Sequence, residues 1–462
     1  MTYDLVVRGG TLVTPQGTER ADLAVEGERI AAIGVGLRGR EVVPAEGTLV
    51  LPGAIDAHTH MDLPVGGTRS SDDFESGTVA AACSGVTTLI DFTVGSAETS
   101  IPEDIERRLA ELSGAAVDVA LHGEVVGRRP SDEELAGAFK RGVTSFKFYT
   151  AYAASGRRST STNLRLSFRV LARLGATALV HCEDEGVIEA ILGTLTSTER
   201  GRMETLARAR PARAEALAID EIASLSRRTG ASVHVVHVSS ALGLEAVARA
   251  KRDGTHLTAE TCPQYLLLTE AVYRGPDGHL YAASPPLRQR EDQEALWEGL
   301  RSGLLDLVAS DHCPFTRAQK TWRGSFLDLP YGLPGVETLL PLLHSEGVAA
   351  GRLPLTALPR LLSAAPARVH GLFPAKGSLA VGADADIVVF DPYAEWTVSA
   401  DRLHMRTDFS PYEGRRVRGD VAATVSRGRV VYAGGSFRGE PGWGRFVPRR
   451  GAGAPPISDS AP

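Results

Sequence analysis

The sequence predicts an α/β fold, a parallel (β/α)8 barrel of the TIM type with a small β-sandwich domain built from both ends of the chain. Both ends alternate apolar and polar residues, whereas the middle alternates short apolar runs with helical stretches. The chain has 462 residues, too many for one small domain, and 43% of them are hydrophobic. It can therefore bury a large core.

The two chain ends are predicted to form one β-sandwich. In residues 1–52 the alternation of "DLVVRGGTLV" is interrupted by Gly-Gly and Gln-Gly turn signals, which are typical of short antiparallel strands. The same pattern returns in residues 371–449, in "GADADIVVFDP" and "VAATVSRGRVVYAGG", before a C-terminal extension. The tail 450–462 is rich in Pro, Gly and Ser, and we predict that it is disordered.

Residues 53–370 are predicted to form the barrel. Eight apolar runs alternate with stretches rich in Ala, Leu, Glu and Arg, such as the helix expected over Ala214–Arg228. The expected strands are "AIDAHTH", "TTLIDF", "VDVALHG", "SFKFYT", "ALVHCE", "VHVVHVSS", "HLTAETC" and "LDLVASDH". Barrels of this kind carry their chemistry at the carboxyl ends of the strands.

Composition argues against several functions. The formal net charge is -6 with both signs spread along the chain, whereas a nucleic-acid binder shows a concentrated basic patch. No run approaches the roughly 18–20 apolar residues of a membrane span, and the start "MTYDLVVRGGTLV" lacks a signal-peptide layout. The four cysteines form no CxxC pair, so we expect a cytoplasmic protein without a disulfide framework.

Metal-ligating residues gather at the carboxyl ends of the predicted strands. His58 and His60 alternate along the first strand, so both imidazoles can reach one ion. The other polar residues in this position are Lys147, His181, His237 and Asp311. Imidazole with carboxylate suits zinc, with manganese or iron as alternatives. Together these residues predict a metal centre.

Lys147 is the unexpected residue of this group. An ammonium has no lone pair for a cation, and fully buried lysines are rare unless paired. A neutral lysine amine can instead add carbon dioxide and become a carbamate, an anion able to bridge two metals. The alternative is an ordinary lysine that reaches solvent or pairs with an acid, and the spacing alone favours that alternative. Cys182 and Cys313 are interpreted as packing residues.

The stretch "LPGAIDAHTHMDLPVGGTRSSDDFESGT" resembles the amino-terminal signature of the dihydropyrimidinase/hydantoinase family of cyclic amidohydrolases. The similarity continues through "GVTSFKFYTAY", "VHVVHVSS", "ETCPQYLLL", "SPPLR", "VASDHCPF" and "GLPGVE" to "GWGRF". The resemblance implies two Zn²⁺ per subunit, for which Mn²⁺ or Co²⁺ can substitute. It implies that a carbamylated Lys147 (N6-carboxylysine) bridges one ion held by His58, His60 and Asp311 and another held by His181 and His237. His234 also has the right residue type, but the resemblance selects His237.

The resemblance further implies an enzyme that opens the cyclic amide of dihydropyrimidines such as dihydrouracil, a step of pyrimidine catabolism, and/or of 5-substituted hydantoins. The products are N-carbamoyl amino acids, and the nucleophile is a hydroxide activated by the two metals. Asp311 would move the proton to the leaving nitrogen, and Tyr152 would donate to the developing oxyanion. Ser284 and groups at Tyr331 would bind the ureide edge. A homotetramer is expected, acting on a small molecule and binding neither nucleic acid nor membrane.

Two positions depart from the family pattern. Tyr331 stands where Asn is usual, and Val65 stands where relatives often carry a bulkier residue such as Phe, which predicts a roomier pocket.

Three other functions are alternatives to this assignment. Dihydroorotases place an Arg at the position of Asp62, where an acid would repel their substrate. Allantoinase is a nearer alternative, although "SSDDFESGT" and "GWGRF" favour the dihydropyrimidinase branch. Non-catalytic scaffold proteins of this fold lack the metal ligands, and this chain has all six.

Overall fold

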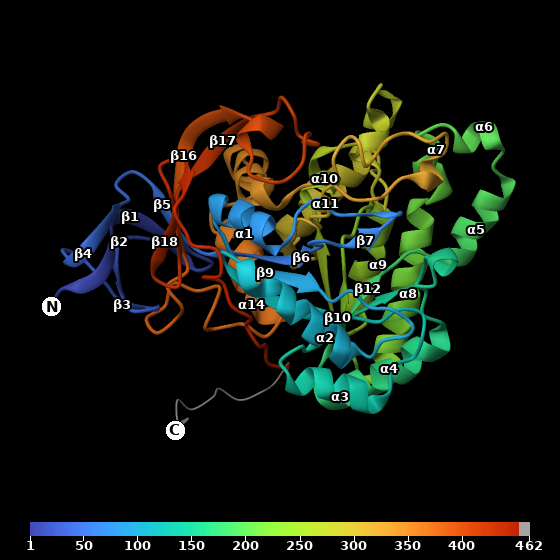
Figure 1. Cartoon of the computed structure of the whole chain (residues 1–462), viewed down its shortest axis with the longest axis horizontal. Helices are drawn as coiled ribbons and strands as arrows, with labels where there is room; N and C mark the ends of the chain where they lie inside the picture. Colours follow the sequence, from blue (N-terminus) through green and yellow to red (C-terminus); the bar gives the residue numbers. More distant parts are fainter. Residues whose placement is uncertain (452–462) are drawn as a thin grey trace.

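The computed structural model describes residues 1–451, which form a barrel and a separate sheet built from both chain ends (Figure 1). The (β/α)8 barrel with a terminal β-domain is therefore confirmed. The tail predicted to be disordered, 450–462, lies almost entirely outside the described residues.

Eight parallel strands form the barrel, in the spatial order β15-β14-β13-β12-β11-β10-β9-β6. Between the two outer strands of this order, Thr59 bridges His312, and the His60 amide donates to the His312 carbonyl at 2.8 Å. All eight predicted strands are present, although the last is short. Their bounds are β6 (Ala54–Thr59), β9 (Val86–Phe92), β10 (Asp118–Glu124), β11 (Ser145–Tyr149), β12 (Thr177–His181), β13 (Ser232–Val235), β14 (Leu257–Thr261) and β15 (Leu307–Val308).

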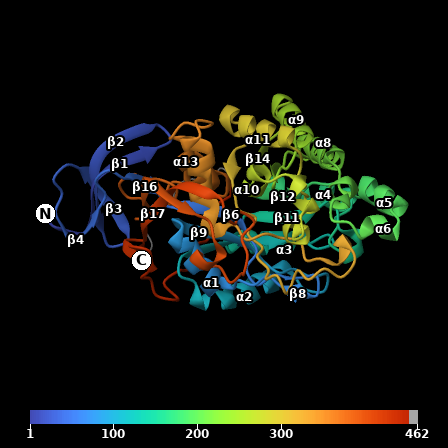
Figure 2. The same ribbon diagram turned by 90° about the horizontal axis from the view of Figure 1, so that it is seen from above.

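Helices surround these strands, as the view from above shows (Figure 2). Several begin at a polar side chain that accepts the amide three residues on, for example at Ser100, Ser131 and Ser240. The helix predicted over Ala214–Arg228 lies within α8. The helices are α1 (Phe74–Cys83), α2 (Ile101–Ala110), α3 (Asp132–Lys140), α4 (Ser161–Leu174), α5 (Glu185–Thr194), α6 (Ser197–Arg200), α7 (Thr205–Ala209), α8 (Ala212–Thr229), α9 (Ala241–Arg252), α10 (Pro263–Leu267), α11 (Arg290–Ser302), α12 (Leu339–Leu342), α13 (Ala357–Pro359) and α14 (Ala365–Val369).

The second sheet joins the two ends of the chain, shown in blue and red in Figure 1. Its order is β19-β18-β17-β16-β5-β1-β2-β3, with β4 beside β1, and the antiparallel pair β5–β16 is the link. The strands are β1 (Tyr3–Thr14), β2 (Gly17–Glu26), β3 (Arg29–Gly34), β4 (Gly39–Pro44), β5 (Leu49–Pro52), β16 (Ile387–Thr397), β17 (Arg416–Ser426), β18 (Arg429–Ala433) and β19 (Ser436–Phe437). The domain boundaries at 52/53 and 370/371 stay predictions.

A buried ion cluster connects the β-domain to the barrel. The ammonium of Lys376 lies 2.8 Å from Asp118 at the start of β10, 3.0 Å from Asp384 and 2.7 Å from Asp386. Arg427 also contacts Asp118, at 3.0 Å. Since a single charge buried here would be costly, each charge of the cluster is paired with a charge from another segment. No helix within residues 1–451 is both long and apolar enough to cross a membrane.

Candidate active site

Two histidines and an aspartate converge at the carboxyl ends of β6 and β15. The Asp311 Oδ1 lies 3.3 Å from the Nε2 atoms of both His58 and His60. In a tetrahedral zinc site with bonds of about 2.0–2.1 Å, neighbouring ligand atoms are about 3.3 Å apart. The buried His58 Nε2 makes no hydrogen bond within residues 1–451. These three atoms therefore fit a divalent metal, and they form one of the clusters able to hold an ion.

A second pair of histidines lies beside this cluster. The Nδ1 of His181, at the end of β12, is 3.0 Å from the Nε2 of His237, which follows β13. The rings of His58 and His237 have centroids 5.5 Å apart, so the two groups adjoin. Burial lowers the pKa of His58 and of His237 well below its usual range, and burial lowers that of His181. Neutral imidazoles are the form that binds metals.

Lys147 lies in β11 and is 2% exposed. Its Nζ lies 5.2 Å from the centroid of the Phe92 ring and 5.5 Å from that of Tyr149. Within residues 1–451 it forms no ion pair. Burial lowers the pKa of Lys147 to about 8, against the opposing charges of Asp311, Glu260 and Glu124. The lysine is therefore held in a site that disfavours the ammonium.

Two buried carboxylates orient the histidines. Glu260 of β14 accepts from His58 Nδ1 at 2.5 Å, which leaves the His58 Nε2 lone pair facing Asp311. Glu183 contacts His181 Nε2 at 2.7 Å, which leaves the Nδ1 facing His237. The sequence reasoning missed both glutamates. The available signal was a charged residue in or directly after an apolar run, and the same signal drew attention to Lys147.

Tyr152 and Ser284 meet next to this cluster. The Tyr152 hydroxyl donates to the Ser284 Oγ at 2.6 Å, and its ring lies 4.8 Å from that of His181. Tyr152 has a left-handed φ of 73°, and the Glu185 carboxylate accepts its amide at 2.7 Å. Burial raises the pKa of Tyr152 to about 12, although Arg210 opposes this. The phenol thus stays protonated and can donate a hydrogen bond.

The segment with Tyr331 lies against a short hairpin, β7 (Pro64–Val65) with β8 (Thr68–Arg69). A side chain at Gly66 would lie 3.2 Å from Pro330, so the hairpin and this segment touch. The Tyr331 hydroxyl donates to the Phe326 carbonyl at 3.0 Å and is therefore engaged in its own loop. The carboxylate of Asp62 pairs with Arg69 at 2.6 Å. Arg69 therefore balances the negative charge of Asp62 that, in the sequence, argues against a dihydroorotase.

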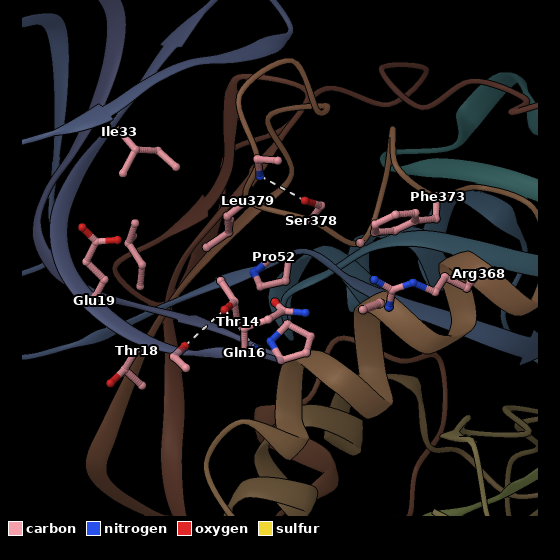
Figure 3. A pocket seen from close by; sticks show the side chains of 16 residues that line it. Thr14, Gln16, Thr18, Glu19, Ile33, Pro52, Arg368, Phe373, Ser378 and Leu379 are labelled. Atoms are coloured by element: carbon pink, nitrogen blue, oxygen red, sulfur yellow. Dashed lines mark hydrogen bonds between the residues drawn. The ribbon is translucent and has the colours of Figure 1, made fainter. Parts of the chain in front are cut away.

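The remaining candidates lie in other environments. His122 uses both ring nitrogens, on Ser145 Oγ at 2.6 Å and the Ala57 carbonyl at 3.0 Å. His234 contacts Thr258 and Glu260, and Cys182 and Cys313 are buried free thiols. A cavity of about 480 Å³ opens instead between the β1–β2 turn and α14, with Arg368 at its edge (Figure 3). None of the candidate site residues lines it.

A parallel barrel with histidines, an aspartate and a lysine gathered toward the carboxyl ends of its strands defines a candidate metal-dependent hydrolase. The sequence model of the amidohydrolase family matches residues 49–431. A D-hydantoinase from Geobacillus stearothermophilus is 39% identical over 97% of both chains, and one from Streptomyces coelicolor is 37% identical over 97% of this chain and 98% of its own. The crystal structure of a dihydropyrimidinase from Brevibacillus agri superposes with a TM-score of 0.94 and 37% identity, covering 97% of this chain and 99% of that one. The chain belongs to the dihydropyrimidinase/hydantoinase family of cyclic amide hydrolases, within the amidohydrolases.

Proposed function

We propose that the strand-end cluster holds two Zn²⁺ ions, which Mn²⁺ or Co²⁺ can replace. His58, His60 and Asp311 would hold one ion, and His181 and His237 the other. The observation that carries the proposal is the convergence of ligand atoms on two adjoining points, with spacings of 3.3 Å and 3.0 Å. Lys147 lies in β11, next to the strand β12 that carries His181, and its anionic form would bridge both ions.

The surroundings of Lys147 support its carbamylation. The neutral amine would attack carbon dioxide, forming an N–C bond and releasing one proton to solvent. The product exchanges a buried cation, which has no ion pair within residues 1–451, for an anion facing two metal positions. The exchange therefore relieves the cost of desolvating the ammonium and supplies a shared ligand.

The reaction proposed is hydrolysis of the cyclic amide of 5-substituted hydantoins and of dihydropyrimidines such as dihydrouracil, which gives N-carbamoyl amino acids. When bound, the metals would supply an activated water and a polarised carbonyl. Asp311 would accept the water's proton and pass it to the ring nitrogen as the C–N bond breaks. Tyr152 would donate to the developing oxyanion, and Ser284 and the main chain at Tyr331 would bind the ureide edge. The names of the D-hydantoinases that resemble the chain support D-selective opening of hydantoins.

The test is ring opening by the protein supplied with zinc and bicarbonate. Dihydrouracil, racemic 5-phenylhydantoin, allantoin and dihydroorotate would be compared, with product chirality read by chromatography. We expect turnover of the first two, formation of the D-product, and loss of activity in Lys147→Ala. Opening of allantoin alone would refute the substrate assignment, and metal binding without any turnover would favour a scaffold role.

A cytoplasmic homotetramer is the form we propose. All four cysteines are free and buried, which suits a reducing compartment. Light scattering of the purified protein measures the assembly, and a monomeric mass would contradict this part of the proposal.

A further inference from the structure

Away from the barrel mouth, a cysteine, a glutamate and a histidine meet behind α1. Cys83 is the last residue of α1, Glu337 lies in the short helix η6 (Val336–Thr338), and His404 follows η9 (Ala400–Arg402). One ligand atom from each lies within 4.8 Å of the other two. Helix α1 packs against β17 and β18, so this group lies on the side of the barrel that faces the β-domain (Figure 1).

The three side chains are held in place by the surrounding backbone. The Ser84 hydroxyl, next to Cys83, donates to the Val336 carbonyl at 3.1 Å and so ties the end of α1 to η6. Glu337 accepts the His404 amide and contacts the His404 Nδ1, both at 2.6 Å. The ligand atoms therefore come from three separate segments that are already fixed relative to one another.

We propose that Cys83, Glu337 and His404 form a second, structural Zn²⁺ site, with the fourth position open to water. A thiolate with an imidazole selects zinc over the oxygen-seeking Mg²⁺ and Ca²⁺. Tetrahedral bonds of about 2.0–2.3 Å place neighbouring ligand atoms about 3.3–3.8 Å apart. The Glu337 oxygen and the His404 Nδ1, now 2.6 Å apart, would therefore separate to admit the ion, and the three ligand atoms already lie within 4.8 Å of one another. His404, with 35% of its side chain exposed, lies on the solvent side where the water would bind.

The charges favour zinc at this point. Cys83 is 6% exposed, and burial with the nearby Glu337 raises the pKa of its thiol, so the thiolate would form there only as a cation binds beside it. On binding, the thiol proton would leave to solvent as the Zn–S bond forms. The His404 imidazole would bind in its neutral form with its one proton on the nitrogen that does not face the metal, and a second ring proton, where present, would also leave to solvent. The dication with one thiolate, one carboxylate and one neutral imidazole then has zero net charge, which suits a buried site. The site also lies at the carboxyl end of α1, whose last turn has no basic residue and whose dipole favours a cation.

A metal ion at this site would stabilise the segments that pack behind the carboxyl ends of the barrel strands. The amides of Gly335 and Val336, next to Glu337, donate to the His312 Nδ1 at 3.1 and 3.4 Å, and His312 follows Asp311. The Arg406 amide, close to His404, donates to Asp72, which contacts the other nitrogen of His312 at 3.2 Å. The zinc would therefore fix both segments that support His312 from behind.

The test uses the full chain loaded with Zn²⁺ or Co²⁺ in bicarbonate and desalted. We expect metal analysis to find one more equivalent in the wild type than in Cys83→Ala or in His404→Gln. The cobalt form should show a thiolate-to-metal charge-transfer band that disappears in Cys83→Ala. Cys182→Ala is the matched thiol control, because it removes the buried thiol next to His181 and should keep the band.

The two proposals can fail separately, since none of the ligands proposed at the barrel mouth is a thiolate. Absence of the band in the wild type would overturn the second site whatever the mouth binds. An extra equivalent that persists in both variants would overturn it as well. His404→Gln changes a partly exposed side chain, so circular dichroism should show an intact fold even if Cys83→Ala is poorly folded.

Discussion

Replacing Glu183 by Gln tests the link between the carboxylates and the proposed metal centre. Glu183 is fully buried and contacts His181 Nε2 at 2.7 Å, the Ser284 hydroxyl at 3.2 Å and the Arg210 guanidinium. Gln has the same shape but no charge, and its NH2 must face a donor, either Arg210 or His181. The substitution therefore leaves a buried guanidinium without its counter-charge and frees the imidazole to change tautomer.

Two effects follow, with separate magnitudes. Removing one partner of a buried ion pair costs about 3–5 kcal/mol of unfolding free energy. Removing the carboxylate behind a ligating histidine lowers metal affinity by about 10–100-fold, or about 1.4–2.8 kcal/mol. Chelator competition measures the affinity, and chemical denaturation measures the stability. Asp118→Asn is the matched control, because Asp118 is an equally buried acid, paired with Lys376 and Arg427, that contacts no candidate ligand.

We expect both variants to lose stability and only Glu183→Gln to lose metal affinity. Equal metal affinity in Glu183→Gln and Asp118→Asn would refute the reasoning. The pH dependence supplies a second check, because Arg210 and His181 hold the pKa of Glu183 well below its usual value of 4.5 in spite of burial. The stability that Glu183 adds is therefore complete above about pH 4.5 and is lost as the pH falls toward the folded pKa. The difference between wild type and Glu183→Gln should shrink in that acid range.

Three further substitutions test other parts of the molecule. Tyr152→Phe removes a donor proposed for the oxyanion, so we expect kcat for 5-phenylhydantoin to fall about 100–1,000-fold in steady-state assays, and an unchanged kcat would contradict that role. Val65→Phe should reduce the preference for phenyl- over methyl-substituted hydantoins, measured as a ratio of kcat/KM; an unchanged ratio would place the pocket wall elsewhere. Lys376→Met removes an ammonium that lies 2.7 to 3.0 Å from three buried carboxylates, so urea denaturation should show a loss of about 3–5 kcal/mol or more, whereas a neutral result would mean that the cluster adds no stability.

The fold could be predicted because the spacing of apolar residues along the chain indicates each strand and helix locally. Each barrel strand is a short apolar run, and even the two-residue β15 is marked by "LDLVASDH" before the turn. The six proposed metal ligands could be located for a related reason, since polar residues at strand ends stand out against apolar runs. The contacts between distant segments could not be predicted. Tyr152 and Ser284 are 132 residues apart, and no periodicity indicates that their hydroxyls meet.

Glu183 and Glu260 were missed for another reason. In the sequence both look like acids at the ends of strands, and such acids are usually solvated. Only the closed barrel shows that both side chains are buried. Their function depends on which histidine lies opposite, and this is set by the pairing of strands rather than by either strand alone. The residues that orient the candidate ligands are therefore harder to predict than the ligands themselves.

The choice between His234 and His237 shows how backbone geometry adds to the sequence pattern. His234 lies within β13 and points inward to Glu260, with Nε2 at 3.0 Å. His237 is three residues further on, so in a regular strand it would point to the opposite face, away from the barrel interior. It reaches His181 because the strand has ended and its own φ is 42°, and Asp311 leaves β15 with a φ of 51° in the same way. Such left-handed conformations cost about 1–3 kcal/mol for residues other than glycine. The chain therefore gives up stability at these two positions, and the proposed metal bonds are the interaction that can offset it.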